Sequence, residues 1–165
     1  MTAKPVSTQV STQVSARPRL SLTVQYAAST RALPSRAQFR RWAQTALEHD
    51  AVVTLRIVGL AEGRVLNRNY RKKDYATNVL TFVFRADGSG APFEGDLALC
   101  APVVVGEARA QKKTLIAHYA HLTVHGMLHL QGYDHEHDAD ARVMEARETQ
   151  ILLKLGYADP YCSTE

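Results

Sequence analysis

Histidine is gathered into one short stretch of this chain. Six of the seven histidines lie between His118 and His137, and three of them, His125, His129 and His135, form the pattern H-x3-H-x5-H. In an α-helix, residues i and i+4 lie on one face, roughly 6 Å apart along the axis. The imidazoles of His125 and His129 can therefore reach a single metal ion.

A glycine between the second and third histidines provides the end of such a helix. Gly132 can stop it because glycine adopts the left-handed backbone conformation without a Cβ penalty, and the turn that follows can bring His135 back to the same ion. Three neutral imidazoles that leave a fourth position to water are typical of a catalytic zinc site. The pattern predicts one Zn²⁺ ion per chain, held by His125, His129 and His135.

The stretch before this glycine is apolar on nearly every side, and such a helix is normally buried. The histidine stripe at His118, His121, His125 and His129 is therefore expected to line an internal cleft. We expect His118 and His121 to orient ligands, contact substrate or reach solvent. Asp134, next to the third histidine of the pattern, is expected to hold a ligand imidazole by its second nitrogen.

The residue after the first histidine of the pattern is Gly126. In zinc peptidases of the H-E-x-x-H type, that position holds the glutamate general base. The spacing H-x3-H-x2-G-x2-H matches the extended metzincin pattern, but the base is missing. A metzincin-like zinc peptidase is therefore the weaker alternative for an enzyme.

Length and composition indicate one domain with a core of its own. The chain has 165 residues, of which 45% are hydrophobic and 22% charged, which are values of a globular protein. The N-terminal segment lacks the apolar core of a secretory signal, and no run of eighteen apolar residues is present. We expect a disordered tail over residues 1–18, a domain over residues 19–165 and a cytoplasmic location. Cys100, in an apolar run, is expected to be a buried thiol.

Charge is distributed unevenly along the chain. Residues 1–85 carry 14 Lys and Arg against 4 Asp and Glu, a balance of +10, and residues 86–165 carry 6 against 12, a balance of −6. A basic half beside a metal cleft favours a polyanionic partner, with nucleic acid first. A solvated basic surface remains the alternative. Four of the cations fall on one side of an expected helix: Arg64, Arg68, Arg71 and Lys72.

Hydrophobic periodicity predicts four strands and five helices. The strands are expected at 20–26, 51–58, 79–84 and 96–101. The helices are expected near 35–48, near 62–70, after Pro102, from about Thr114, and over 138–155. Strands that come first and helices that dominate the end indicate an α+β fold, with a sheet covered on one face by helices and the histidine helix central. The pattern leaves the order of the strands open.

Two of these helices have a predicted buried face. The helix near 62–70 is expected to bury Val65, Leu66 and Tyr70. The helix over 138–155 is expected to turn four side chains inward: Val143, Met144, Ile151 and Leu152.

The residues resemble a known family. HGMLHLQGYDH, around the three histidines, resembles the signature of the YbeY family of bacterial metal-dependent endoribonucleases. LNRNYRKKDYATNVLTF, GDLALC and MEARETQILLKLGYADPY resemble further segments of that family, so the likeness covers roughly Leu20–Tyr161. The sequence departs from the family pattern at two positions, with Thr81 in place of the usual Ser and Val83 in place of a common Pro. Neither residue is expected to take part in the chemistry.

The resemblance implies a zincin-like fold, a mixed sheet with helices on one side, and a function. His125, His129 and His135 would be the zinc ligands and Arg71 the active-site arginine. Independently of the resemblance, Arg68 is a candidate substrate contact because it lies on the basic side of the expected helix. The substrate would be ribosomal RNA, notably the small-subunit 3′ end, cut as a single strand, and the ribosome would be the partner in maturation and quality control. Two alternatives stay open: a zinc-containing RNA- or ribosome-binding factor without turnover, and, for Arg71, a surface salt bridge with Asp74.

Overall fold

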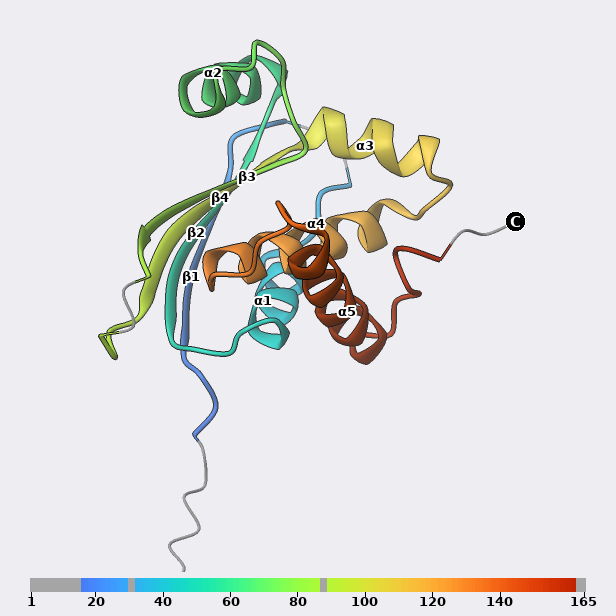
Figure 1. Cartoon of the computed structure of the whole chain (residues 1–165). Helices are drawn as coiled ribbons and strands as arrows, with labels where there is room; N and C mark the ends of the chain where they lie inside the picture. Colours follow the sequence, from blue (N-terminus) through green and yellow to red (C-terminus); the bar gives the residue numbers. More distant parts are fainter. Residues whose placement is uncertain (1–15, 30–31, 87–88, 163–165) are drawn as a thin grey trace, which may run out of the picture.

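Four strands and five helices alternate in the part of the chain that the computed structural model describes, residues 16–29, 32–86 and 89–162 (Figure 1). Most of the tail expected over residues 1–18 lies outside these ranges. In chain order the elements are β1 (Leu20–Tyr26), α1 (Arg36–Thr45), β2 (Ala51–Val58), α2 (Leu60–Arg71), β3 (Val79–Arg85), β4 (Phe93–Cys100), α3 (Ala101–Ala110), α4 (Leu115–Leu130) and α5 (Asp138–Lys154).

The α+β fold expected from the sequence is confirmed. The first two strands coincide with their predicted ranges, β3 is longer by one residue, and β4 begins three residues earlier than predicted. Pro102 lies in the first turn of α3, where its missing N–H costs no helical hydrogen bond. In the described ranges, no helix is both long and apolar enough to cross a membrane.

The sheet has the strand order β1-β2-β4-β3. β1, β2 and β4 are parallel, whereas β3 runs antiparallel to β4 at one edge, with Thr81 opposite Leu97. The three parallel strands are joined by segments that contain helices, as parallel pairing requires. β3 is consequently an edge strand, and its outer side is open to a neighbouring element.

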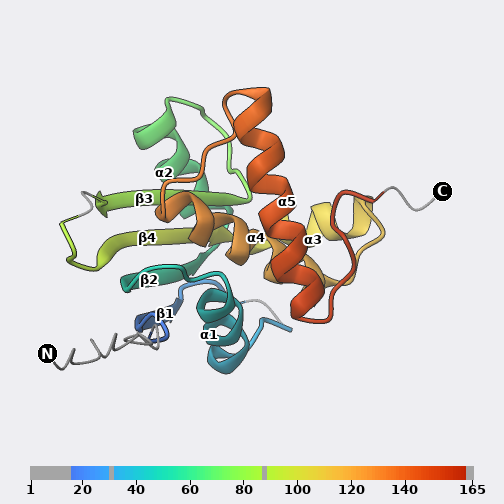
Figure 2. The same cartoon turned by 60° about the horizontal axis from the view of Figure 1, so that its bottom comes forward.

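Helices α1 and α4 pack on one face of the sheet, and α5 packs on the outside of α4 (Figures 1 and 2). α4 lies between the sheet and α5, so it is covered on most sides, which explains its nearly continuous apolar sequence. The core between these layers is rich in side chains from the sheet, α1 and α4. Its largest fully buried members are Trp42, Tyr119, Phe39, Leu55, Ile57, Leu97, Leu99, Met127, Leu128, Leu130, Met144 and Leu152.

Two glycines let α4 approach the edge of the sheet closely. A Cβ at Gly95 in β4 would collide with the side chain of Leu130 and with the backbone carbonyl of Phe82 in β3. A Cβ at Gly126 in α4 would lie 2.9 Å from Leu97 Cδ2. The sequence therefore fixes the histidine helix directly beside β3 and β4.

The prediction for the buried side of α2 was wrong. Val65 and Tyr70 are 43% and 63% exposed and Leu66 is half-buried, whereas Gly63 and Asn67 are buried. The helix packs against the face of the sheet opposite α4, through a stripe of small and polar residues. The large apolar side chains of α2 are thus left near solvent.

The physical cause is the contact that Gly63 and Asn67 make. A Cβ at Gly63 would lie 3.0 Å from the Cys100 Sγ atom, so the absent side chain lets the helix backbone approach the end of β4. Cys100 is buried, as predicted. One turn later, Asn67 Nδ2 donates a 2.6 Å hydrogen bond to the backbone carbonyl of Tyr75, which ties α2 to the segment that leads into β3.

The prediction for α5 was correct for three residues and wrong for one. Met144, Ile151 and Leu152 are buried, but Val143 is 60% exposed. The inward stripe instead includes Glu148, which is completely buried. A carboxylate in that position needs polar partners, and these lie at the histidine cluster.

Candidate metal centre

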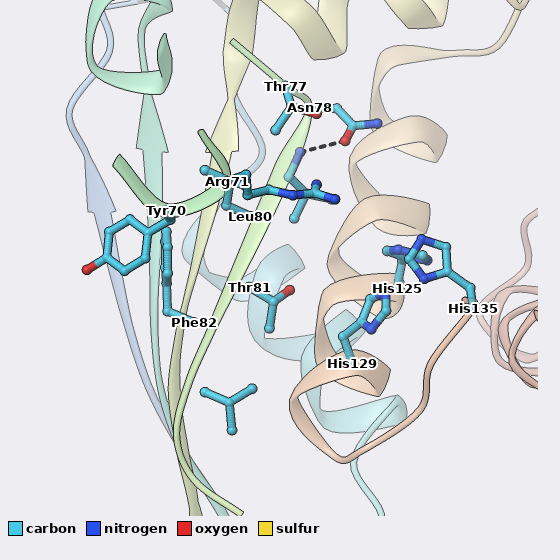
Figure 3. A pocket seen from close by; sticks show the side chains of 12 residues that line it. Tyr70, Arg71, Thr77, Asn78, Leu80, Thr81, Phe82, His125, His129 and His135 are labelled. Carbon is cyan, nitrogen blue, oxygen red and sulfur yellow. Dashed lines mark hydrogen bonds between the residues drawn. The ribbon is translucent and has the colours of Figure 1, made fainter. Parts of the chain in front are cut away.

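Two elements position the three histidines of the H-x3-H-x5-H pattern (Figure 3). His125 and His129 lie one turn apart near the end of α4. The chain then reverses at Gly132, whose φ is +99°, and its N–H donates to the backbone carbonyl of His129 at 3.0 Å. The helix end predicted at this glycine is confirmed, and the turn returns His135 to the other two rings.

The three imidazoles form one cluster. One nitrogen from each ring lies within 4.8 Å of the others, and the ring centroids are 4.6 Å (His125–His129), 4.7 Å (His129–His135) and 5.6 Å (His125–His135) apart. Three imidazole nitrogens are the donor set of known catalytic zinc sites. The residues present therefore fit a divalent metal ion such as zinc.

The surroundings keep the middle histidine neutral. Burial, together with the neighbouring rings of His125 and His135, lowers the pKa of His129 to about 4. Its imidazole is then unprotonated near neutral pH, and a histidine binds a metal only in this form.

A buried carboxylate from α5 holds His125 from behind. Glu148 Oε1 lies 2.5 Å from Nδ1 of His125, and Oε2 lies 2.8 Å from Nε2 of His121. The hydroxyl of Tyr161 donates a hydrogen bond to the same Oε2 atom. Because Nδ1 of His125 donates to Glu148, its Nε2 is left free for a ligand role.

This carboxylate is charged despite its burial. Burial by itself would raise the pKa of Glu148, but the hydrogen bonds from His121, His125 and Tyr161 outweigh that effect and lower the pKa to about 2. A negative charge therefore lies directly behind one member of the histidine cluster, where it fixes the orientation of that imidazole.

Neither Glu148 nor Tyr161 was singled out in the sequence. A signal for Glu148 was present, because the residue lies four positions after Met144 and three before Ile151, in the middle of the apolar stripe of α5. An acidic residue on a buried face is rare unless it is paired. Tyr161, in the C-terminal segment after α5, gave no such signal.

Asp134 has a different role from the one expected. Its Oδ1 accepts the backbone N–H of His135 at 2.6 Å and that of Glu136 at 3.3 Å, which fixes the turn carrying the third histidine. A carboxylate oxygen lies 3.7 Å from Nδ1 of His135, too far for a hydrogen bond. Asp134 therefore orients His135 through the backbone rather than through the ring.

The other two histidines of the α4 stripe are bound to carboxylates. His121 is held by Glu148, as described above, and His118 lies 2.7 Å from an oxygen of Glu107 in α3. Glu107 also accepts hydrogen bonds from Nδ2 of Asn78, at the start of β3. These contacts link α3, α4 and β3 beside the cluster and leave neither His118 nor His121 among the residues that line the cleft.

The cluster opens into a cleft of about 430 Å³ between α4, β3 and the end of α2. Arg71, the last residue of α2, extends its guanidinium across this cleft toward the histidines (Figure 3). The residues that line the cleft are Tyr70, Arg71, Thr77, Asn78, Val79, Leu80, Thr81, Phe82, Val83, His125, His129 and His135.

Arg71 does not form the surface salt bridge with Asp74 that the alternative interpretation assigned to it. Asp74 pairs with Arg64 at 2.7 Å and lies 3.9 Å from Arg68. In the part of the chain that the structure describes, no carboxylate forms an ion pair with Arg71. Arg71 is thus brought to the histidine cluster with its charge available, whereas Arg68 lies outside the cleft lining.

Gly126 faces the sheet and not the cleft. Because a Cβ there would contact Leu97, a glutamate at this position would be forced into the apolar core. The site therefore has no room for the general base of an H-E-x-x-H peptidase, which weighs against the peptidase alternative.

Fold and site together define a class of protein: an α+β domain whose cleft joins a three-histidine cluster, able to bind a metal, to an available arginine. The comparison with protein families identifies the member of this class, because residues 24–156 match the family described as "Endoribonuclease YbeY". The chain belongs to this family and is an enzyme of the hydrolytic nuclease type. The resemblance noted in the sequence is confirmed.

Curated relatives agree with this assignment. The endoribonuclease YbeY of Nitrosospira multiformis is 60% identical over 88% of this chain and 85% of its own length. That of Nitrosomonas europaea is 56% identical over 86% of this chain and 85% of its own length. Among solved structures, the solution structure of TM1509 from Thermotoga maritima matches with a TM-score of 0.50 and 20% identity, over 85% of this chain and 99% of that one. This last likeness supports the fold alone.

Proposed function

We propose that this protein is a zinc-dependent endoribonuclease that cuts single-stranded segments of ribosomal RNA precursors, including the small-subunit 3′ end, and acts on the ribosome in the cytoplasm. The observation that carries the proposal is the cleft itself, where three histidine nitrogens within 4.8 Å of one another face Arg71. The names of the relatives, all endoribonucleases, support RNA as the substrate.

His125, His129 and His135 would hold the zinc ion. When bound, zinc supplies a Lewis acid that activates water and polarises a phosphoryl oxygen. The neutral imidazoles leave the positive charge of the ion undiminished, while Glu148 fixes the ring of His125 and Asp134 fixes the turn at His135. Two of the three proposed ligands are thus held in place, His125 from α5 and His135 by its own turn.

Arg71 would bind the non-bridging oxygens of the scissile phosphate. Its planar guanidinium offers two parallel N–H donors, which match a phosphate geometrically as well as in charge. Negative charge builds on those oxygens in the transition state, and a donor aimed at them lowers the barrier. The cleft lining contains no carboxylate among the described residues, so a polyanion can enter it without repulsion.

The experiment that tests this function uses two substrates and a chelator. Purified protein loaded with zinc is expected to cleave single-stranded ribosomal RNA fragments, to lose that cleavage in excess chelator and regain it when zinc is restored, and to leave casein intact. Cleavage of casein would favour the peptidase alternative. RNA binding without cleavage, in protein shown to contain zinc, would favour the binding-factor alternative.

Glu148→Gln is expected to weaken zinc binding about 10- to 100-fold, the usual cost of losing a carboxylate behind a ligand histidine. The substitution keeps the size of the side chain but removes the charge that His125 and His121 contact. Competition with a fluorescent chelator measures the zinc affinity. Glu145→Gln, at an exposed position of the same helix, is the matched control, and equal affinity in both variants would show that Glu148 serves the fold alone.

A further inference from the structure

An aromatic pair, formed by exposed Tyr70 and half-buried Phe82, continues the candidate metal cleft over the free edge of the sheet. The ring centroids of Tyr70, near the end of α2, and Phe82, in β3, are 4.3 Å apart, and both residues line the same cleft as Arg71 and the histidines. In Figure 3 the two rings lie on one side of β3 and the histidines on the other, with Arg71 reaching across. Tyr70 is 63% exposed.

The Tyr70 ring is not needed to attach α2 to the sheet. α2 is attached to the sheet through Gly63 and Asn67, so the Tyr70 side chain is not part of that contact. The ring is nevertheless held by Phe82, whose plane is inclined 57° to it. A large ring that is exposed, restrained by a second ring and adjacent to an arginine is a preorganised contact surface.

The chemistry of this surface fits an unpaired nucleobase. Proteins that bind single-stranded nucleic acid combine aromatic side chains, on which bases stack, with cations that contact the backbone phosphates. Tyr70 and Arg71 are consecutive residues, so they can serve the base and the phosphate of one stretch of chain. An acidic or apolar peptide fits less well, because the surface offers one aromatic pair beside a cationic cleft rather than a closed apolar groove.

We propose that Tyr70, supported by Phe82, is a base-stacking subsite for single-stranded RNA, which crosses the edge of β3 with its scissile phosphate at Arg71. The inference rests on the proposed endoribonuclease function and adds a residue-level reason for a preference for single strands. A base in a duplex is already stacked on its neighbours and must leave them to reach Tyr70. Stacking is tolerant of sequence, since every base has an aromatic face.

The test is a binding measurement with the zinc-loaded protein and a single-stranded 2′-O-methyl RNA oligonucleotide that contains 2-aminopurine. Tyr70→Ala is expected to raise Kd about 5- to 150-fold, the range for loss of one base–aromatic stack, and to abolish quenching of the fluorescent base. Tyr70→Phe keeps the ring and is expected to rescue both. In cleavage assays, Tyr70→Ala is expected to raise KM while leaving zinc content unchanged.

Tyr75→Ala is the matched control, because Tyr75 is 55% exposed, lies five residues along the chain and is not part of the cleft lining. Wild-type Kd and quenching in Tyr70→Ala would overturn the subsite and leave the aromatic pair as a surface for a protein partner. If the wild-type protein itself neither bound nor cleaved RNA, the proposed function would fail, which is a distinguishable result.

Discussion

His129→Ala is expected to remove zinc from the protein and to abolish RNA cleavage. His129 is the middle member of the cluster, with ring centroids 4.6 and 4.7 Å from those of His125 and His135. Its loss leaves two imidazoles at a site that needs three protein ligands. Elemental analysis is expected to fall from about one zinc per chain to none, with cleavage reduced to the level seen in excess chelator.

His137→Ala is the control for this substitution. His137 belongs to the same histidine-rich stretch, but it is exposed and lies at the start of α5 without a side-chain hydrogen bond to the helix. The variant is expected to keep both zinc and cleavage, and equal zinc content in the His129 and His137 variants would contradict the assignment of the ligands.

Local features of the sequence predicted much of this structure because each had a local physical cause. The strand alternation at Leu20–Tyr26, the β-branched run at Ala51–Val58 and the left-handed turn at Gly132 depend on a few neighbouring residues. The gathering of His125, His129 and His135 is similar, since the spacing alone places two rings on one helix face and one just beyond its end. The strand order depends on pairings between distant segments, and the sequence pattern does not encode it visibly.

The failures had a common origin in tertiary contacts. For α2, hydrophobicity favoured burying Val65 and Tyr70, but the space that Gly63 leaves at Cys100 determined which side faces the sheet. For Asp134, proximity to a ligand histidine suggested a contact with its ring, but the nearest donors were backbone N–H groups. The buried side of a helix and the donors that a carboxylate binds both depend on which cavity or donor lies within reach after folding.

The role of Glu148 at the candidate site also depends on tertiary contacts and could not be predicted from the sequence. Its partner His125 is 23 residues away in sequence, so no spacing rule connects them, and only its place on a buried stripe marked it as unusual. The clustering of the three histidines was thus predictable from residue type and spacing. The group that holds one of them in place required the packing of α5 on α4.

Arg71→Lys is expected to reduce the rate of RNA cleavage about 10²- to 10³-fold, the typical cost of losing one transition-state donor. Lysine keeps the charge but lacks the planar fork that contacts two phosphate oxygens together. A residue that contributes equally to ground and transition states would alter KM and leave kcat unchanged, whereas a residue that acts in the transition state lowers kcat. The position of Arg71 across the cleft from the histidines favours the second behaviour.

Single-turnover cleavage with saturating enzyme separates these two behaviours, because binding no longer limits the observed rate. Arg68→Ala is the matched control: Arg68 lies on the same helix, outside the cleft lining and 3.9 Å from Asp74, and its loss is expected to weaken RNA binding only. Both variants are expected to retain zinc, since neither residue belongs to the histidine cluster. A wild-type single-turnover rate in Arg71→Lys would make Arg71 a binding residue, and the charge opposite the histidines would then serve only to retain RNA in the cleft.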